Sequence, residues 1–256
     1  MDWGALVIAT LQLYQQAARE TWEKIWGNWW IGLLPLLYGS IFFFTARLVT
    51  PLGIVGGFIL GLVLAVCTSS YLYFLAAVVN GSRVNVSDLA ESWRPYLGSV
   101  ISIMFFLYIV QYTLALLLPP SAETRTLAMF IDWALLIILN PIPEIIYLGR
   151  SEGLNMLQES GDFLRGSGVE WFVPLLALAL FSFLLPLPIL LVPLQVGQLT
   201  FPTLSGTGIF FGSVVGLFWG LVSAFLLFVL MVFRGFLFRA LSGHSRRQRV
   251  FRSRFS

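Results

Sequence analysis

The chain has 256 residues, of which 58 % are apolar and only 11 % are charged, and its mean hydropathy is +0.88. A soluble domain carries about twice that share of charged residues, so the composition excludes an ordinary soluble protein. About six membrane helices of some 20 residues fit into this length, and a second soluble domain does not. We therefore expect a single all-α polytopic membrane domain over 1–256.

Six apolar segments are long enough to cross a bilayer. In chain order they are 29–48, 53–80, 97–119, 126–149, 171–195 and 208–240. Six spans place both ends of the chain on one side of the membrane. If that side is the cytoplasm, thirteen of the 15 arginines and lysines lie inside, and only Arg47 and Arg125 lie outside. This asymmetry follows the positive-inside rule, so we expect a bacterial inner-membrane protein with cytoplasmic N and C termini.

A short motif, Glu-[Ser/Thr]-x5-Gly-[Asn/Ser], occurs three times, each time ahead of an apolar run. Its glutamate and glycine positions are Glu20 and Gly27, Glu91 and Gly98, and Glu159 and Gly166. The spacing predicts three direct repeats, 5–80, 81–149 and 150–240, each an interfacial amphipathic helix followed by a transmembrane hairpin. The alternative is chance similarity among apolar segments of low complexity.

The first motif copy lies on an expected amphipathic helix. Its apolar stripe consists of Val7, Leu11, Tyr14, Ala18, Trp22 and Ile25, which recur at helical spacing. Such a helix would lie in the membrane surface with this stripe against the lipid. The motif glycine would end the helix with a positive φ and turn the chain into the bilayer.

Glycines at every fourth position mark two of the expected spans. They are Gly53, Gly57 and Gly61 in the second span, and Gly208, Gly212, Gly216 and Gly220 in the sixth. A ridge of glycines lets another helix approach closely, so we interpret these residues as packing positions, either within the chain or against a second subunit.

Only two acidic residues, Asp132 and Glu144, fall inside the expected spans, and both are on the fourth. They are about 18 Å apart along a helix, too far for a catalytic pair. Asn140, Pro141 and Pro143 precede Glu144, and the prolines predict a break in this helix. A carboxylate beside a broken membrane helix is typical of a substrate or ion pathway. The alternative, which the nearby Arg150 favours, is a kinked helix end whose Glu144 reaches the cytoplasmic surface.

The end of the chain, 241–256, is a basic cytoplasmic tail. It contains Arg246, Arg247, Arg249, Arg252 and Arg254, which fit the binding of anionic lipid headgroups, and its alternative role is a topology signal only. Arg234 and Arg239, at the end of the sixth span, are expected to extend to the inner surface.

Signatures of enzymes are missing from the sequence. The only histidine, His244, lies in the tail, so no histidine-based nucleophile or metal site is expected. No glycine-rich phosphate loop follows a strand. We expect a non-catalytic protein that has no metal or cofactor and does not bind nucleic acid.

Two junctions and one longer stretch carry a family resemblance. The junctions are Asn80-Gly81 and Arg234-Gly235, and the stretch runs from Pro143-Glu144 through Leu154, Leu157 and Glu159-Ser160 to Gly166. They resemble a bacterial family of six-helix membrane proteins that includes the membrane domain ahead of some glycerophosphodiester phosphodiesterases. The resemblance covers nearly the whole chain. It implies a fold and an inner-membrane location, and no catalytic residues.

Three functions are compatible with these observations. The first is a membrane subunit of a transport system or of a lipid- or envelope-handling system, with membrane lipids as partners. The second is a permease of the ABC-exporter type, whose cytoplasmic ATPase would contact 81–96 and 150–170. Elbow helices of such permeases are not normally repeated three times, which weighs against it. The third and least favoured is an intramembrane enzyme using Asp132 and Glu144.

Overall fold

The computed structural model describes residues 3–82, 84–118, 122–149, 151–184 and 214–243. Within these ranges the chain is helical and contains no strand. In chain order the elements are α1 (Trp3–Ile25), the 3-10 helix η1 (Trp26–Leu33), α2 (Leu34–Val49), η2 (Thr50–Leu52), α3 (Ile54–Val79), η3 (Val86–Ala90), α4 (Leu97–Leu117), α5 (Ala122–Leu139), α6 (Ile142–Leu148), α7 (Asn155–Leu184) and α8 (Val214–Ser242).

Five candidate membrane spans occur in the described ranges, judged by helix length and hydropathy. They are Val7–Leu52, Ile54–Val79, Leu97–Leu117, Thr126–Leu148 and Gly220–Ser242. The helical character expected from the sequence is therefore present, with five helices long and apolar enough to cross a membrane among the described residues. The remaining expected span, 171–195, begins in α7 and extends beyond the described residues.

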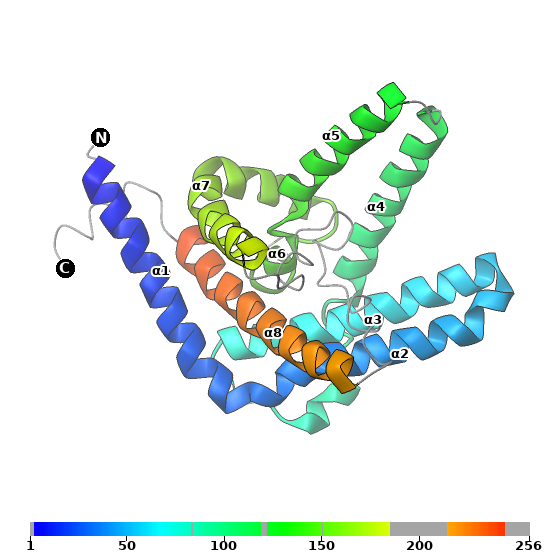
Figure 1. Cartoon of the computed structure of the whole chain (residues 1–256), viewed down its shortest axis with the longest axis horizontal. Helices are drawn as coiled ribbons and strands as arrows, with labels where there is room; N and C mark the ends of the chain where they lie inside the picture. Colours follow the sequence, from blue (N-terminus) through cyan, green and yellow to red (C-terminus); the bar gives the residue numbers. More distant parts are fainter. Residues whose placement is uncertain (1–2, 83, 119–121, 150, 185–213, 244–256) are drawn as a thin grey trace.

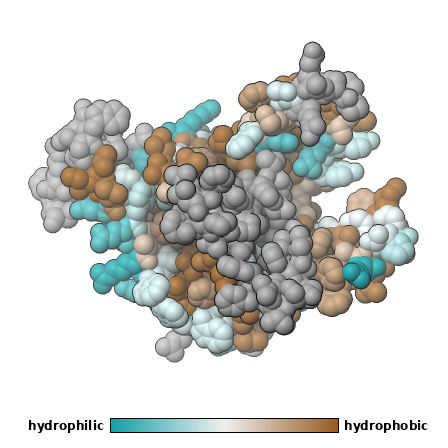
Figure 2. Space-filling model, viewed as in Figure 1, coloured by the Kyte–Doolittle hydropathy of each residue, from teal (hydrophilic) through white to brown (hydrophobic). Residues whose placement is uncertain are grey.

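Two helical hairpins project from the body of the molecule (Figure 1). The first consists of α2 and α3, which run side by side, and the second of α4 and α5, which diverge from their common end. Apolar surface is visible on both hairpins (Figure 2). On the first hairpin, Leu48, Ile54 and Phe58 are each more than three-quarters exposed. Apolar surface of this extent suits contact with lipid rather than with water.

The core lies where the C-terminal halves of α3 and α8 meet the short helix α6 and the middle of α7. Its largest fully buried apolar side chains include Tyr71, Phe74, Trp171, Phe228 and Phe238. The helix α6 packs against α3, α7 and α8, so every face of it is covered by another helix. Residues of α6 are consequently interior residues.

The expectation that the motif glycines end their helices is wrong. Positive φ occurs at Gly53, Gly81 and Gly153 among the described residues, and at none of the three motif positions. Gly166 lies inside α7, which continues into the next apolar segment. A glycine within a helix costs only about 1 kcal/mol, which the packing of a 30-residue helix can offset.

The chain turns instead at Asn28, whose φ of −133° and ψ of 26° are not helical. The side chain of Asn28 is buried and donates a hydrogen bond to the carbonyl of Lys24. This bond satisfies a backbone acceptor at the end of α1, where the helix itself supplies no donor. The asparagine of the first motif copy therefore makes the turn that we expected of its glycine.

The apolar stripe expected on α1 does not form one face. Of its members, Ile25 is buried, beside Ala17 and Thr21, where α1 packs on α8, and the Tyr14 hydroxyl donates to the carbonyl of Glu170 in α7. Val7, Leu11, Ala18 and Trp22 are exposed on another side of the helix. Because α1 covers α8, only this exposed side is free to contact lipid.

A Cβ atom built on Gly53, Gly57 or Gly61 meets nothing within 4 Å, so no helix approaches closely at the glycines expected to pack in the second span. Of the glycines marked in the sixth span, Gly208 and Gly212 lie outside the described residues and Gly220 is buried in α8. The close approach is at Gly235, where a Cβ would lie 2.7 Å from both the Tyr147 hydroxyl and Val79 Cγ2.

We expect Gly235→Ala to lower the free energy of unfolding by about 1–3 kcal/mol, because the added methyl group overfills this contact. Equilibrium unfolding in mixed micelles measures the change. Gly61→Ala is the matched control, since its methyl group meets no atom and the substitution gains up to about 1 kcal/mol of helix propensity. Equal effects of the two substitutions would contradict the close packing at Gly235.

Candidate functional site

The predicted break in the fourth span is confirmed. Helix α5 ends at Leu139, and α6 begins at Ile142. Pro141 and Pro143 lack the N–H groups that a continuous helix would need, and the backbone resumes helical bonding from Ile145 N to Pro141 O at 3.0 Å. The break leaves Asn140 in a turn and places Glu144 in the first turn of α6.

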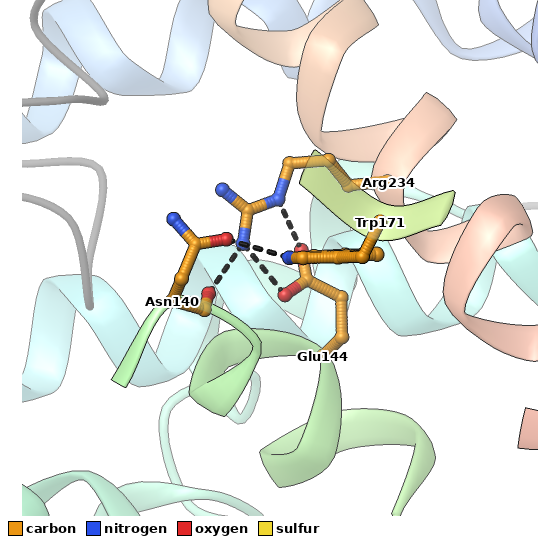
Figure 3. Close-up of polar contacts among 4 residues, drawn as sticks. All are labelled: Asn140, Glu144, Trp171 and Arg234. Carbon is orange, nitrogen blue, oxygen red and sulfur yellow. Dashed lines mark hydrogen bonds and ion pairs between the residues drawn. The ribbon is translucent and has the colours of Figure 1, made fainter. Parts of the chain in front are cut away.

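Glu144 forms an ion pair with Arg234 of α8, which is 90 residues away in sequence. The guanidinium donates from Nε to Glu144 Oε1 and from Nη2 to Oε2, each at 2.8 Å (Figure 3). The side chains of Glu144 and Arg234 are 0 % and 2 % exposed. Two parallel charge-assisted bonds of this geometry fix the orientation of both groups.

This arrangement overturns two expectations. Arg234 does not extend to the inner surface, and Glu144 does not reach that surface beside Arg150. The physical reason is that α6 lies between α3, α7 and α8. Its first helical turn, which contains Glu144, therefore faces the interior of the molecule. Each buried charge then needs an opposite charge, and the pair supplies it.

Asn140 and Trp171 complete the network around Arg234. The guanidinium Nη2 also donates to the Asn140 carbonyl at 2.6 Å, and the indole Nε1 of Trp171 donates to Asn140 Oδ1 at 2.7 Å (Figure 3). The guanidinium carbon lies 5.1 Å from the centroid of the Trp171 ring, within the range of a cation–π contact. One arginine thus joins the helix break to α7 and α8.

A second buried network consists of hydroxyl groups. The Ser70 hydroxyl of α3 lies 2.5 Å from the hydroxyls of both Tyr38 in α2 and Ser92 in the turn after η3. Ser69 donates to the carbonyl of Trp93 in the same turn. These bonds attach the second motif copy to the first hairpin.

The second and third motif copies are held by their hydroxyl residues more than by their glutamates. Thr21, Ser92 and Ser160, which follow the glutamates, are all buried. Ser160 donates to the carbonyl of Ile138 in α5, and Ser92 bonds to α3. Each of these two copies therefore contacts the second helix of the hairpin before it.

The motif glutamates lie nearer the surface. Glu20 pairs with Arg239 of α8 at 3.0 Å, and Glu159 accepts a hydrogen bond from the backbone N–H of Ser151 at 3.1 Å. Glu91 is exposed. The first copy is thus attached to α8, the last helix, and neither Glu20 nor Glu159 takes part in the Glu144–Arg234 network.

Of the other expected site residues, Asp132 is half-buried in α5, about two turns before the helix break. The five tail arginines, Arg246 to Arg254, lie outside the described residues, and so does His244. In the part of the chain that the structure describes, no group of three or more His, Cys, Asp or Glu side chains could hold a metal ion.

Arg234 is the residue of this buried network whose position was wrongly expected from the sequence. A signal for it was present, because Arg234 and Glu144 are opposite charges inside two different apolar spans. Comparison of the chain with protein-family models, with curated proteins and with solved structures gives no match.

Proposed function

We propose that the chain is a non-catalytic polytopic protein of the bacterial inner membrane, which works as a membrane subunit of a transport or lipid- and envelope-handling system. The observation that carries the proposal is the fully buried Glu144–Arg234 pair beside a broken helix. Both residues fall within candidate membrane spans.

Burying charged side chains costs free energy, so a buried ion pair needs a reason to be present. A buried ion pair is expensive to desolvate, and apolar residues of similar volume often give an equally stable protein. Charged residues inside membrane spans accordingly mark pathways for substrates, ions or protons. Transporters also build such sites from discontinuous helices, and the α5–α6 break is a discontinuity of that kind.

The proposal includes six spans in three direct repeats, with both termini in the cytoplasm. It is supported by the contacts of the motif copies, since the second copy bonds to α3, the third to α5 and the first to α8. In a ring of three units, each copy would contact the hairpin that precedes it, and α8 would precede the first copy. The basic tail and the exposed face of α1 would contact lipid headgroups.

Purification of the tagged protein from its host in mild detergent, followed by mass spectrometry of proteins and lipids, tests this function. A stoichiometric ATPase would favour the ABC-exporter alternative, in which 81–96 and 150–170 contact that ATPase. Another stoichiometric membrane protein, or one retained lipid species, supports the proposed function. Recovery of the chain without any partner or specific lipid would contradict it.

A further inference from the structure

Four buried side-chain atoms have no hydrogen-bond partner in the part of the chain that the structure describes. They are Thr68 Oγ1, Tyr71 OH, Asn140 Nδ2 and Tyr147 OH. All four can donate a hydrogen bond, and the three hydroxyls can also accept one. Native proteins leave few such groups unpaired, and ordered water commonly supplies the partner.

These atoms come from neighbouring helices. Thr68 and Tyr71 are one turn apart on α3, while Asn140 and Tyr147 lie on either side of Glu144 along the chain. The helix α6 packs against both α3 and α8. Asn140 is joined to the ion pair through its carbonyl, which accepts a hydrogen bond from Arg234, and Tyr147 follows Glu144 by three residues in α6.

The Tyr147 hydroxyl lies where the three helices meet. A Cβ atom built on Gly235 of α8 would be 2.7 Å from this hydroxyl and 2.7 Å from Cγ2 of Val79 in α3. Tyr71 is also buried in α3, which packs against α6, and no hydrogen bond joins Tyr71 to Tyr147 among the described contacts. Two unbonded hydroxyls on helices that are in contact can be satisfied together by one small molecule that both donates and accepts.

The charges at the site indicate which molecule fits. Arg234 already neutralises Glu144 in a bidentate pair, so the site has no net charge to attract a free ion. A neutral molecule with two donors and two acceptors matches the mixture of hydroxyl and amide groups. Water has this chemistry, and it is the smallest molecule that does.

We propose that ordered water binds between α3, α6 and α8, where it is held by Tyr71, Tyr147 and the side-chain amide of Asn140. On the α8 side this water meets the Glu144–Arg234 network, since the Tyr147 hydroxyl lies against Gly235, which follows Arg234. This inference does not depend on what the protein transports or with which subunit it assembles.

Tyr147→Phe gives the first test, in the full-length protein in detergent. A hydroxyl bonded to water loses a hydrogen bond in this variant, so the midpoint of thermal unfolding falls. A buried hydroxyl without a partner destabilises the protein, so replacing it by hydrogen would raise the midpoint of thermal unfolding. A raised midpoint would overturn the proposal. Tyr108→Phe is the control, since Tyr108 is exposed on α4 and its variant should unfold like the wild type.

Infrared spectroscopy in ordinary and oxygen-18 water identifies the partner as water. The wild type should show an O–H stretching band that shifts with the isotope, and Tyr147→Phe should lose or displace that band while Tyr108→Phe keeps it. A lower unfolding midpoint without any isotope-sensitive band would assign the partner to another protein group, and would overturn the proposal. Neither result changes the outcome of the purification that tests the proposed function.

Discussion

Glu144→Ala is expected to lower the free energy of unfolding by about 3–5 kcal/mol, because it leaves the Arg234 guanidinium buried without its counter-charge. Arg234 would keep only its bond to the Asn140 carbonyl, together with the contact to the Trp171 ring. The loss is measured by equilibrium unfolding in mixed micelles, followed by tryptophan fluorescence and by circular dichroism of the helices.

Two further variants test whether the loss of stability comes from leaving a buried charge without its partner. Glu20→Ala removes the partner of Arg239 in a pair that is 48 % exposed at the arginine and 32 % at the glutamate, so its effect should be at most about 1 kcal/mol. Replacing both members of the buried pair, as Glu144→Leu with Arg234→Met, should restore much of the loss. Equal effects of Glu144→Ala and Glu20→Ala would show that the first pair is not buried.

Trp171→Ala is expected to cost about 3–5 kcal/mol, as is typical for removing a large aromatic side chain from a core. Trp171 is fully buried and packs edge-to-face on Phe163 and Phe238. Its indole also holds Asn140 by a hydrogen bond and covers the face of the Arg234 guanidinium. The same unfolding measurement applies to this variant.

Trp171→Phe distinguishes packing from hydrogen bonding. The phenyl ring keeps much of the apolar contact, but it leaves Asn140 Oδ1 without its donor, which costs about 1–3 kcal/mol. Trp29→Ala is the control on η1, since Trp29 is more than half exposed and its loss should change the stability little. A stability of Trp171→Ala close to that of the wild type would contradict the position of this ring in the core.

Local features of the structure could be predicted from the sequence. The apolar runs predicted the long helices, and the paired prolines predicted the break before Glu144, because both depend only on nearby residues. The partner of Glu144 could not be predicted in this way. It depends on how α6 packs between α3 and α8, and no local pattern specifies a contact between residues that are 90 positions apart.

The motif shows the same limit at a smaller scale. The spacing of the motif is visible in the sequence, and it led us to expect that the repeated glutamates and glycines were the residues that matter for its structure. The buried members of the motif are instead the hydroxyl residues Thr21, Ser92 and Ser160, because their side chains face neighbouring helices. A helical pattern indicates which residues share a face, but only the packing shows which face is covered, as the divided stripe of α1 illustrates.

The most direct test of the account is native mass spectrometry of the wild type, Glu144→Gln and Glu20→Gln, each purified in mild detergent. Glu144→Gln removes the charge of the buried pair at nearly constant shape, and Glu20→Gln does the same at the partly exposed pair. We expect the wild type and Glu20→Gln to retain the bound lipid or partner, and folded Glu144→Gln to lose it. The same bound species in all three proteins would contradict it.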